Sequence, residues 1–375
     1  MNPVIPFVDL QAAYRELRAE LDDAVGRVAA SGLYLLGSEL RAFEEAFASY
    51  VGAKHCVGVA NGLDALHLAL RGMGIGSGDE VIVPSNTYVA TWLGVTHAGA
   101  TPVPVEPDPE TFNIDPDRIA KAITPRTRAI IPVHLYGQPA DMAPLRAIAE
   151  RFGLRVLDDA AQAHGARYNG RRIGAGTDAC AWSFYPTKNL GAWGDGGAVT
   201  TDDDALADAL RLLRNYGSRM RYVNEEIGWN SRLDEVQAAI LGVKLTRLDE
   251  WNARRTLRAQ TYLERLAGFP LVLPTVRNWA TPVWHLFVVR SRARDALREA
   301  LADRGIQTIV HYPVAPHMQS AYASLGFAPG DFPIARAMHQ QVLSLPIGPH
   351  LTEASQDDVV DALRASLSLV AGGDT

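Results

Sequence analysis

Residues 156–164 read Val-Leu-Asp-Asp-Ala-Ala-Gln-Ala-His, and residues 183–189 read Ser-Phe-Tyr-Pro-Thr-Lys-Asn. In the first stretch an apolar run ends in two acids, and in the second an apolar run leads to Lys188. Both runs predict buried β-strands that carry polar side chains at their carboxyl ends. Ligands of open α/β sheets bind outside the carboxyl ends of the strands, so the two stretches predict a sheet and a site at its edge.

A lysine and a carboxylate at strand ends are what pyridoxal phosphate (PLP) chemistry requires, because the lysine forms a Schiff base and the acid keeps the pyridine nitrogen protonated. Lys188 leaves a buried strand rather than a solvated helix. Desolvation in such a place lowers the pKa of the amine and makes it nucleophilic. Asp158 and Asp159 point to opposite faces of their strand, so one acid enters the site and the other caps or faces solvent.

The phosphate of PLP needs a cradle of its own. Asn61 and Gly62 lie at the start of a helix directly after a strand, where free backbone N–H groups and the helix dipole favour an anion. Ser183 either donates its hydroxyl to the same phosphate or bonds to backbone. Tyr88 follows another strand at the same sheet edge, where it either stacks on the pyridine ring or belongs to the core.

Short apolar runs alternate with amphipathic helical stretches through the first two thirds of the chain. The predicted strands are 56–59, 81–83, 102–105, 128–133, 155–157, 179–184 and 197–200, and the predicted helices between them are 65–70, 89–97 and 142–151. This alternation predicts an α/β fold with a mainly parallel sheet and helices on both faces.

The pattern changes in the last third. A charged helical stretch covers 233–266, and beyond Pro282 we expect strands at 285–289 and 307–310 and helices at 294–304, 334–343 and 355–367. We therefore place a boundary near Trp251. It separates a large PLP-binding domain, residues 1–250 with segment 1–20 packed on it, from a small C-terminal α+β domain, residues 251–375.

Composition excludes several classes of function. The net charge is −6, with 47% hydrophobic and 21% charged residues, which favours neither nucleic-acid binding nor an unfolded chain. Two cysteines cannot form a disulfide framework at this length. The chain has no signal-peptide pattern and no apolar run long enough to span a membrane. We therefore expect a soluble cytoplasmic protein without a nucleic-acid or membrane partner.

Four motifs together resemble the DegT/DnrJ/EryC1/StrS family of PLP-dependent nucleotide-sugar aminotransferases. They are Asp-Ala-Ala-Gln at 159–162, Ser-Phe-Tyr-Pro-Thr-Lys-Asn-Leu-Gly at 183–191, Gly-Asp-Gly-Gly at 194–197 and Asn-Ser-Arg-Leu-Asp at 230–234. The similarity runs over nearly the whole chain, from residues 6–10 to 345–346. It implies the fold of aspartate aminotransferase (fold type I) and a homodimer with its active site at the interface.

The resemblance also assigns single residues. Lys188 matches the Schiff-base lysine, Asp159 the partner of the pyridine nitrogen, and Gln162 the residue near the 3-hydroxyl of PLP. Tyr88 matches the stacking aromatic. The phosphate-binding positions are Gly62, Leu63, Ser183 and, from the other subunit, Asn230. Candidate sugar or nucleotide contacts are Tyr185, Tyr216, His311 and Tyr312.

One position departs from the family pattern. Many members have Gly-Thr where this chain has Gly62-Leu63, so a phosphate-binding hydroxyl is replaced by a side chain that cannot donate. At this position only the backbone N–H of Leu63 can bind the phosphate.

The variant Asn-Gly-Leu-Asp-Ala-Leu at 61–66 resembles the branch that aminates C3 of a dTDP-3-keto-6-deoxyhexose. The resemblance implies L-glutamate as amino donor and a dTDP-3-amino-3,6-dideoxyhexose as product. The nearest alternative is the same chemistry at C4 of a GDP-, UDP- or dTDP-4-keto sugar. A PLP-dependent dehydratase is a second alternative, against which Lys188 argues because dehydratase relatives carry histidine there. A PLP-binding protein without activity is a third, disfavoured by the complete set of Lys188, Asp159 and the phosphate site.

Overall fold

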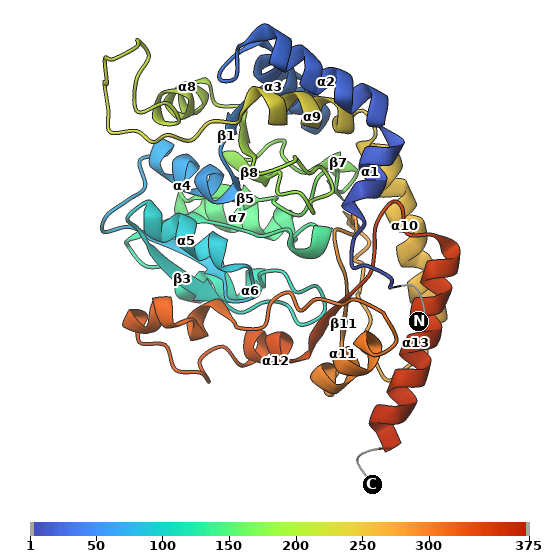
Figure 1. Cartoon of the computed structure of the whole chain (residues 1–375). Helices are drawn as coiled ribbons and strands as arrows, with labels where there is room; N and C mark the ends of the chain where they lie inside the picture. The colour runs from blue at the N-terminus through green and yellow to red at the C-terminus, as the bar shows by residue number, and fades with distance from the viewer. Residues whose placement is uncertain (1–3, 373–375) are drawn as a thin grey trace.

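The computed structural model describes residues 4–372 (Figure 1). Its central sheet has seven strands in the order β1-β9-β8-β5-β4-β2-β3. Their bounds are His55–Val59 (β1), Glu80–Pro84 (β2), Thr101–Val105 (β3), Thr127–Ile130 (β4), Arg155–Asp159 (β5), Ala179–Ser183 (β8) and Gly197–Thr201 (β9). Neighbours from β8 to β3 run parallel, whereas β9 is antiparallel to β8 and β1. The prediction of a mainly parallel sheet is confirmed.

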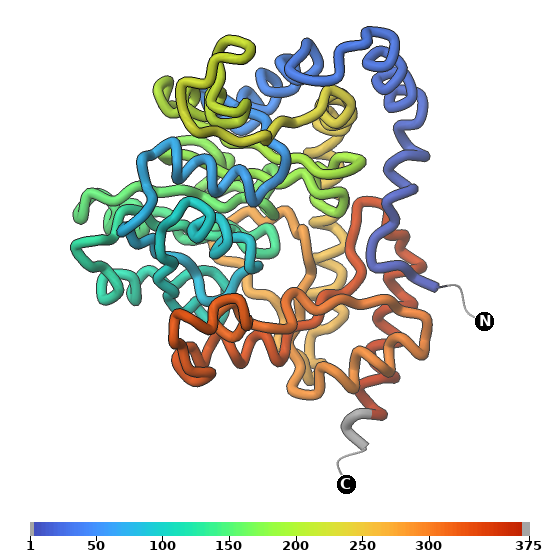
Figure 2. The backbone as a smooth tube through the Cα atoms, turned by 60° about the vertical axis from the view of Figure 1, so that its left-hand side comes forward, coloured from blue at the N-terminus to red at the C-terminus, as the bar shows by residue number. Residues whose placement is uncertain are grey.

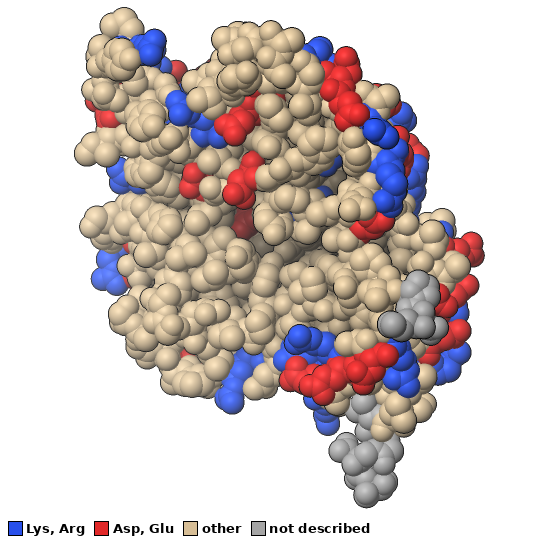
Figure 3. All heavy atoms as spheres, in the orientation of Figure 1, with Lys and Arg blue, Asp and Glu red and all other residues tan. Residues whose placement is uncertain are grey.

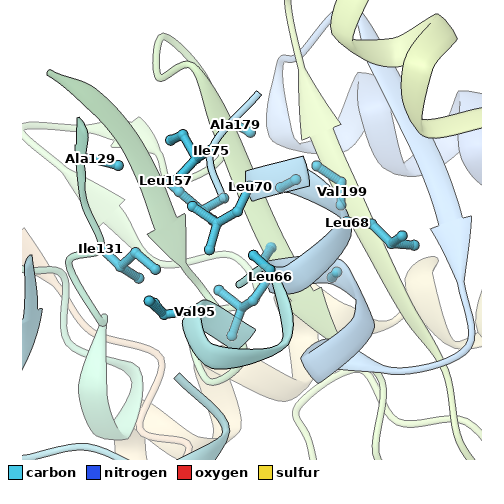
Figure 4. Packing of buried hydrophobic residues seen from close by; sticks show 14 of the residues in the cluster. Leu66, Leu68, Leu70, Ile75, Val95, Ala129, Ile131, Leu157, Ala179 and Val199 are labelled. Carbon is cyan, nitrogen blue, oxygen red and sulfur yellow. The ribbon is translucent and has the colours of Figure 1, made fainter. Parts of the chain in front are cut away.

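Both faces of the sheet are covered by packed side chains. Successive side chains of a strand point to opposite faces, so each strand contributes to two clusters. Along β8, Ala179 and Ala181 join the hydrophobic cluster under α4. Cys180 and Trp182 join the cluster on the other face. Figure 4 shows leucines of α4 beside the side chains of the strands in the first cluster. Burying each such leucine contributes about 1.5–3 kcal/mol, so these two layers hold the strand ends in place.

The helices of this part lie between the strands in sequence. They are α4 (Gly62–Gly72), α5 (Val89–His97), α6 (Pro116–Ile119), α7 (Met142–Phe152), α8 (Asp204–Leu213) and α9 (Glu235–Leu245). Three short strands, Arg167–Tyr168 (β6), Arg171–Arg172 (β7) and Ala280–Thr281 (β10), form a separate small sheet.

Three helices precede the first strand: α1 (Leu10–Glu16), α2 (Arg18–Ser31) and α3 (Ser38–Val51). Sequence analysis did not single them out. Leu17 and Leu21 pack with Ile240 and Trp251, while Ile5 forms a parallel bridge with Ile306. The N-terminal segment thus contacts both parts of the chain, and Figures 1 and 2 show it beside the C-terminal elements.

The described C-terminal part contains a two-stranded antiparallel sheet, four α-helices and two short 3-10 helices, Pro316–Met318 and Ser320–Leu325. The bounds are α10 (Leu248–Arg265), β11 (Phe287–Arg290), α11 (Arg294–Ala302), α12 (Pro333–Gln341), β12 (Val342–Leu345) and α13 (Glu353–Gly372). Helix α10 runs through the boundary expected near Trp251, and Tyr262 of this helix packs on Phe287 with ring centroids 5.0 Å apart. The division into domains 1–250 and 251–375 stays a prediction.

One expected element of this part is wrong and another ends earlier than expected. Residues 307–310 form no regular strand, because Gln307 donates to the carbonyl of Ile5 and only Ile309 bridges to Ser344. The helix expected over 334–343 ends at Gln341, because the apolar residues that follow pair with β11. The helical stretch 233–266 is divided into α9 and α10.

The surface in Figure 3 carries acidic and basic side chains interspersed with each other rather than one large basic patch. Within residues 4–372, no helix combines the length and apolar character needed to cross a membrane. Cys56 and Cys180 are both buried and free.

Candidate active site

The site begins where β5 and β8 end. These strands are parallel neighbours with Asp159 opposite Ala181, so Asp159 and the turn after Ser183 lie at the same edge of the sheet. The turn is closed by hydrogen bonds from Lys188 N to Tyr185 O and from Ala192 N to Phe184 O, both 2.8 Å. This places Lys188 beside Asp159, as the two sequence stretches predict.

Lys188 carries a half-buried amine. Within the described residues it has no acidic partner inside 4 Å. Burial lowers the pKa of Lys188 to about 8, although the charge of Asp159 opposes the shift. Near neutral pH a minor fraction of the amine is therefore unprotonated, larger than for an ordinary lysine, and this free amine is the form that acts as nucleophile and proton acceptor.

Asp159 is buried, with 5% of its surface exposed. Its Oδ2 accepts a 2.9 Å hydrogen bond from Thr91 Oγ1, and its Oδ1 accepts a 3.2 Å bond from Ala161 N. Burial raises the pKa of this carboxyl, and the Thr91 bond acts in the opposite direction. A cation beside Asp159 would also lower the pKa of the carboxyl and so oppose the effect of burial. A protonated pyridine nitrogen is such a cation.

A chain of polar contacts extends from Gln162. Its Oε1 accepts from Tyr136 N at 2.6 Å, and its Nε2 donates to the Tyr312 hydroxyl at 2.9 Å. The ring of Tyr312 lies 4.9 Å from the ring of Tyr88. The structure thus brings Gln162, Tyr312 and Tyr88 together beside Asp159, and the half-exposed Tyr88 is free to receive a flat ring.

Within residues 4–372, the start of α4 presents free backbone N–H groups, which an anion cradle requires. Asn61 caps the helix by accepting from Asp64 N at 2.8 Å. A Cβ at Gly62 would lie 2.6 Å from Cβ of Ser183, so the close approach of these residues requires glycine. The backbone N–H groups of Gly62 and Leu63 have no acceptor in the described part of the chain. Unpaired N–H groups at a helix N-terminus beside a serine hydroxyl fit a phosphate group.

Tyr185 contacts this set through its backbone, which accepts a hydrogen bond from Lys188 N and donates one from its own N to Ser183 Oγ at 3.4 Å. Within residues 4–372, Tyr216 and Asn230 form no hydrogen bond with the set. Tyr185 and Tyr216 are about half exposed. Asn230 is exposed and forms an antiparallel bridge with Asn215, next to Tyr216. Their expected roles stay predictions.

His311 is closer to the centre of the site. Its Nδ1 lies 2.8 Å from Ser344 Oγ. Burial, assisted by the charge of Lys188, lowers the pKa of His311 to about 4. Its imidazole is therefore neutral at pH 7.

Sequence reasoning missed several residues that hold this site. Thr91 follows Tyr88 by three positions in the first turn of α5, a spacing that places both at one end of the helix. Asn189, the neighbour of Lys188, donates to Asn252 Oδ1 and Val283 O, both at 2.8 Å. No local pattern indicates these partners, which lie 63 and 94 residues away along the chain.

Known proteins resemble this chain over nearly its whole length. The profile of the DegT/DnrJ/EryC1/StrS aminotransferase family matches residues 15–364. A dTDP-3-amino-3,4,6-trideoxy-alpha-D-glucose transaminase of Streptomyces venezuelae is 59% identical over 364 residues, which cover 97% of this chain and 96% of that protein.

Two solved structures share the fold. The crystal structure of S. venezuelae DesV in complex with a ketimine intermediate has a TM-score of 0.96 and 58% identity, covering 98% of this chain and 99% of that chain. NtdA of Bacillus subtilis with bound cofactor PMP, the amine form of PLP, has a TM-score of 0.91 and 32% identity, covering 98% of this chain and 86% of that chain.

Proposed function

The chain belongs to the DegT/DnrJ/EryC1/StrS aminotransferase family, and from this premise we propose that it transfers the amino group of L-glutamate to C3 of a dTDP-3-keto-6-deoxyhexose. The products are 2-oxoglutarate and a dTDP-3-amino-3,6-dideoxyhexose. The observation that carries the chemistry is the desolvated amine of Lys188 beside buried Asp159. The choice of sugar is supported by the 59% identity to a dTDP-3-amino-sugar transaminase.

The cofactor of this reaction is PLP, which when bound supplies an electron sink for the carbon that loses its proton. We propose that Asp159 bonds the pyridine nitrogen, that Gln162 lies at the 3-hydroxyl and that Tyr88 stacks on the ring. The phosphate would be held by the N–H groups of Gly62 and Leu63, the hydroxyl of Ser183 and Asn230 of a second copy. The unbonded N–H groups at the start of α4 and the raised pKa of Asp159 support this assignment.

Lys188 moves the protons. Its Nζ accepts the proton from Cα of the amino donor and, in the second half of the reaction, delivers a proton to the sugar carbon that receives nitrogen. A pKa of about 8 suits both directions, because the amine gains and loses a proton readily near neutral pH. The negative charge of Asp159 stabilises positive charge opposite it in the buried site.

We also propose that Tyr185, Tyr216, His311 and Tyr312 contact the nucleotide sugar. His311 is neutral at pH 7, so it would act as a hydrogen-bonding group rather than as a cation. Tyr312 already accepts a hydrogen bond from Gln162. Its contact with the sugar would therefore couple the substrate to the residue proposed for the 3-hydroxyl of PLP.

A homodimer is part of the proposal. The loop that carries Tyr216 and Asn230 also exposes Tyr222 and Ile227, which are 85% and 87% exposed. Exposed large apolar side chains near a site favour burial by another chain. A second copy would cover them and bring Asn230 to the neighbouring phosphate cradle. We place the reaction in the cytoplasm, since buried free cysteines such as Cys56 and Cys180 suit a reducing compartment.

The first test is the visible absorbance of the purified PLP-loaded protein before and after addition of L-glutamate. A yellow band that bleaches supports the donor half of the reaction. A protein that stays colourless with added PLP contradicts the cofactor, and a band that ignores glutamate contradicts the donor. The dTDP-3-keto sugar is then added and the product is examined by NMR, where nitrogen on C4 instead of C3 would contradict the proposed position.

A further inference from the structure

A cavity lies beside the Lys188 turn. It has a volume of about 260 Å³ and is lined by residues from turn 186–193, the N-terminal segment 8–13, helices α9 and α10, and residues 349–350. Among the residues proposed to bind PLP or the sugar, only Lys188 lines it. The cavity is therefore separate from the start of α4 and from the Asp159–Gln162 region.

Two buried cations line this cavity without an acidic partner. Lys244 and Arg255 are 6% and 4% exposed. Lys244 Nζ donates to Gly191 O at 2.6 Å, which uses one of its three donors. Every hydrogen bond that Arg255 makes in the described part of the chain leaves from Nη1 to a carbonyl oxygen, at 3.2–3.4 Å. Within residues 4–372 neither side chain forms an ion pair.

The nearby acids are already engaged. Asp9, which lines the cavity, pairs with Arg15 at 2.6 Å. Glu16 pairs with Arg254 at 2.9 Å and with His350 at 2.6 Å. Neither acid neutralises Lys244 or Arg255. Burial alone lowers the pKa of Lys244 to about 8 and that of Arg255 to about 10, with no acid opposing the shift.

Buried charges in proteins are normally paired. The two unpaired cations of this cavity therefore favour the binding of an anion. A guanidinium binds a carboxylate through its planar fork, and an ammonium binds one as a point charge. The remaining wall includes Val8, Leu10 and two tryptophans, Trp193 and Trp251. Apolar wall in the same cavity as two cationic groups suits the methylene carbons of a ligand with two carboxylates.

We propose that this cavity binds a small dicarboxylate, with one carboxylate at Lys244, the other at Arg255 and a short methylene chain between them. The inference uses neither the proposed sugar nor the proposed amino donor. It assigns a ligand to two buried cations that have no role in the transfer of protons by Lys188.

Glutarate tests the proposal, because it has two carboxylates and no amine to react with PLP. Isothermal titration of the PLP-loaded enzyme is expected to show a glutarate site besides any binding at the place of the amino donor, which glutarate resembles, so Lys244→Met should leave the KM for L-glutamate unchanged. Lys244→Met should weaken the binding at least tenfold, because it removes the charge and keeps most of the side-chain length. Lys121→Met is the matched control, since Lys121 is exposed and lies outside the cavity. The fluorescence of Trp193 and Trp251 should change on binding.

Several results would overturn the proposal: no binding of glutarate, equal binding by Lys244→Met and wild type, or equally tight binding of butyrate or inorganic phosphate. If Lys244→Met does not fold, Lys244→Gln replaces it, because the amide can still donate to Gly191 O. The titration needs no turnover, so an enzyme that binds glutarate here but fails to transaminate would contradict the proposed function and leave this site intact.

Discussion

Removal of one hydroxyl from α5 should weaken the site that holds the cofactor. Thr91 Oγ1 donates to Asp159 Oδ2 at 2.9 Å, and both side chains are buried. Thr91→Val keeps the shape of the side chain and removes the donor. Because the bond favours the charged carboxylate, its loss should raise the pKa of Asp159 beyond the rise that burial already causes.

The size of the effect follows from the bonds of the carboxylate. From the residues that the structure describes, only two hydrogen bonds reach it, and the other, from Ala161 N, is longer at 3.2 Å. A hydrogen bond to a charged group contributes about 1.5–3 kcal/mol, and about 1.4 kcal/mol corresponds to a factor of ten in affinity. If PLP binds against the ionised form of Asp159, Thr91→Val should raise the Kd for PLP roughly 10- to 100-fold.

The assay is titration of the PLP-free protein with PLP, followed by visible absorbance. Thr87→Val is the matched control, because the Thr87 hydroxyl lies 2.8 Å from that of Thr91 but does not bond Asp159. In an Asp159→Asn variant, the addition of Thr91→Val should change the Kd for PLP little further. A Kd for Thr91→Val within twofold of that for Thr87→Val would refute the reasoning.

Three further changes test other parts of the site and fold. Lys188→Ala should abolish turnover while the far-ultraviolet circular dichroism stays that of wild type; turnover at the wild-type rate would contradict the assignment of the amine. Gly62→Ala should lower the melting temperature and PLP affinity, because its Cβ would lie 2.6 Å from Cβ of Ser183. Gly26→Ala, whose Cβ meets nothing within 4 Å, should do neither. Burial raises the pKa of Glu16, but hydrogen bonds from an arginine and a histidine bring it down to about 2. Its contribution to stability is therefore present above pH 4.5 and lost as the pH falls toward 2, so Glu16→Gln should melt below wild type at pH 7 and near it at pH 2.

The strand ends were predictable because the signal is local. An apolar run long enough to cross a buried sheet must end in residues that face solvent or a ligand, and both Asp159 and the Lys188 turn follow such runs. The same holds for Gly62, which follows β1 directly and begins α4. Strands at 307–310 and the end of α12 were predicted less well, because backbone partners such as Ile5 and β11 decided them.

The residues that set the charge state of the site are far along the chain from their partners. Thr91 is 68 positions from Asp159, and Lys244 is 53 positions from Gly191. A threonine in the first turn of a helix is ordinary, and so is a lysine in the last turn, where the helix dipole favours it. What makes each unusual is burial, which depends on the packing of several elements and has no periodicity of its own. Local pattern therefore locates the groups that carry the chemistry, whereas the neighbours that set their charge state require the assembled fold.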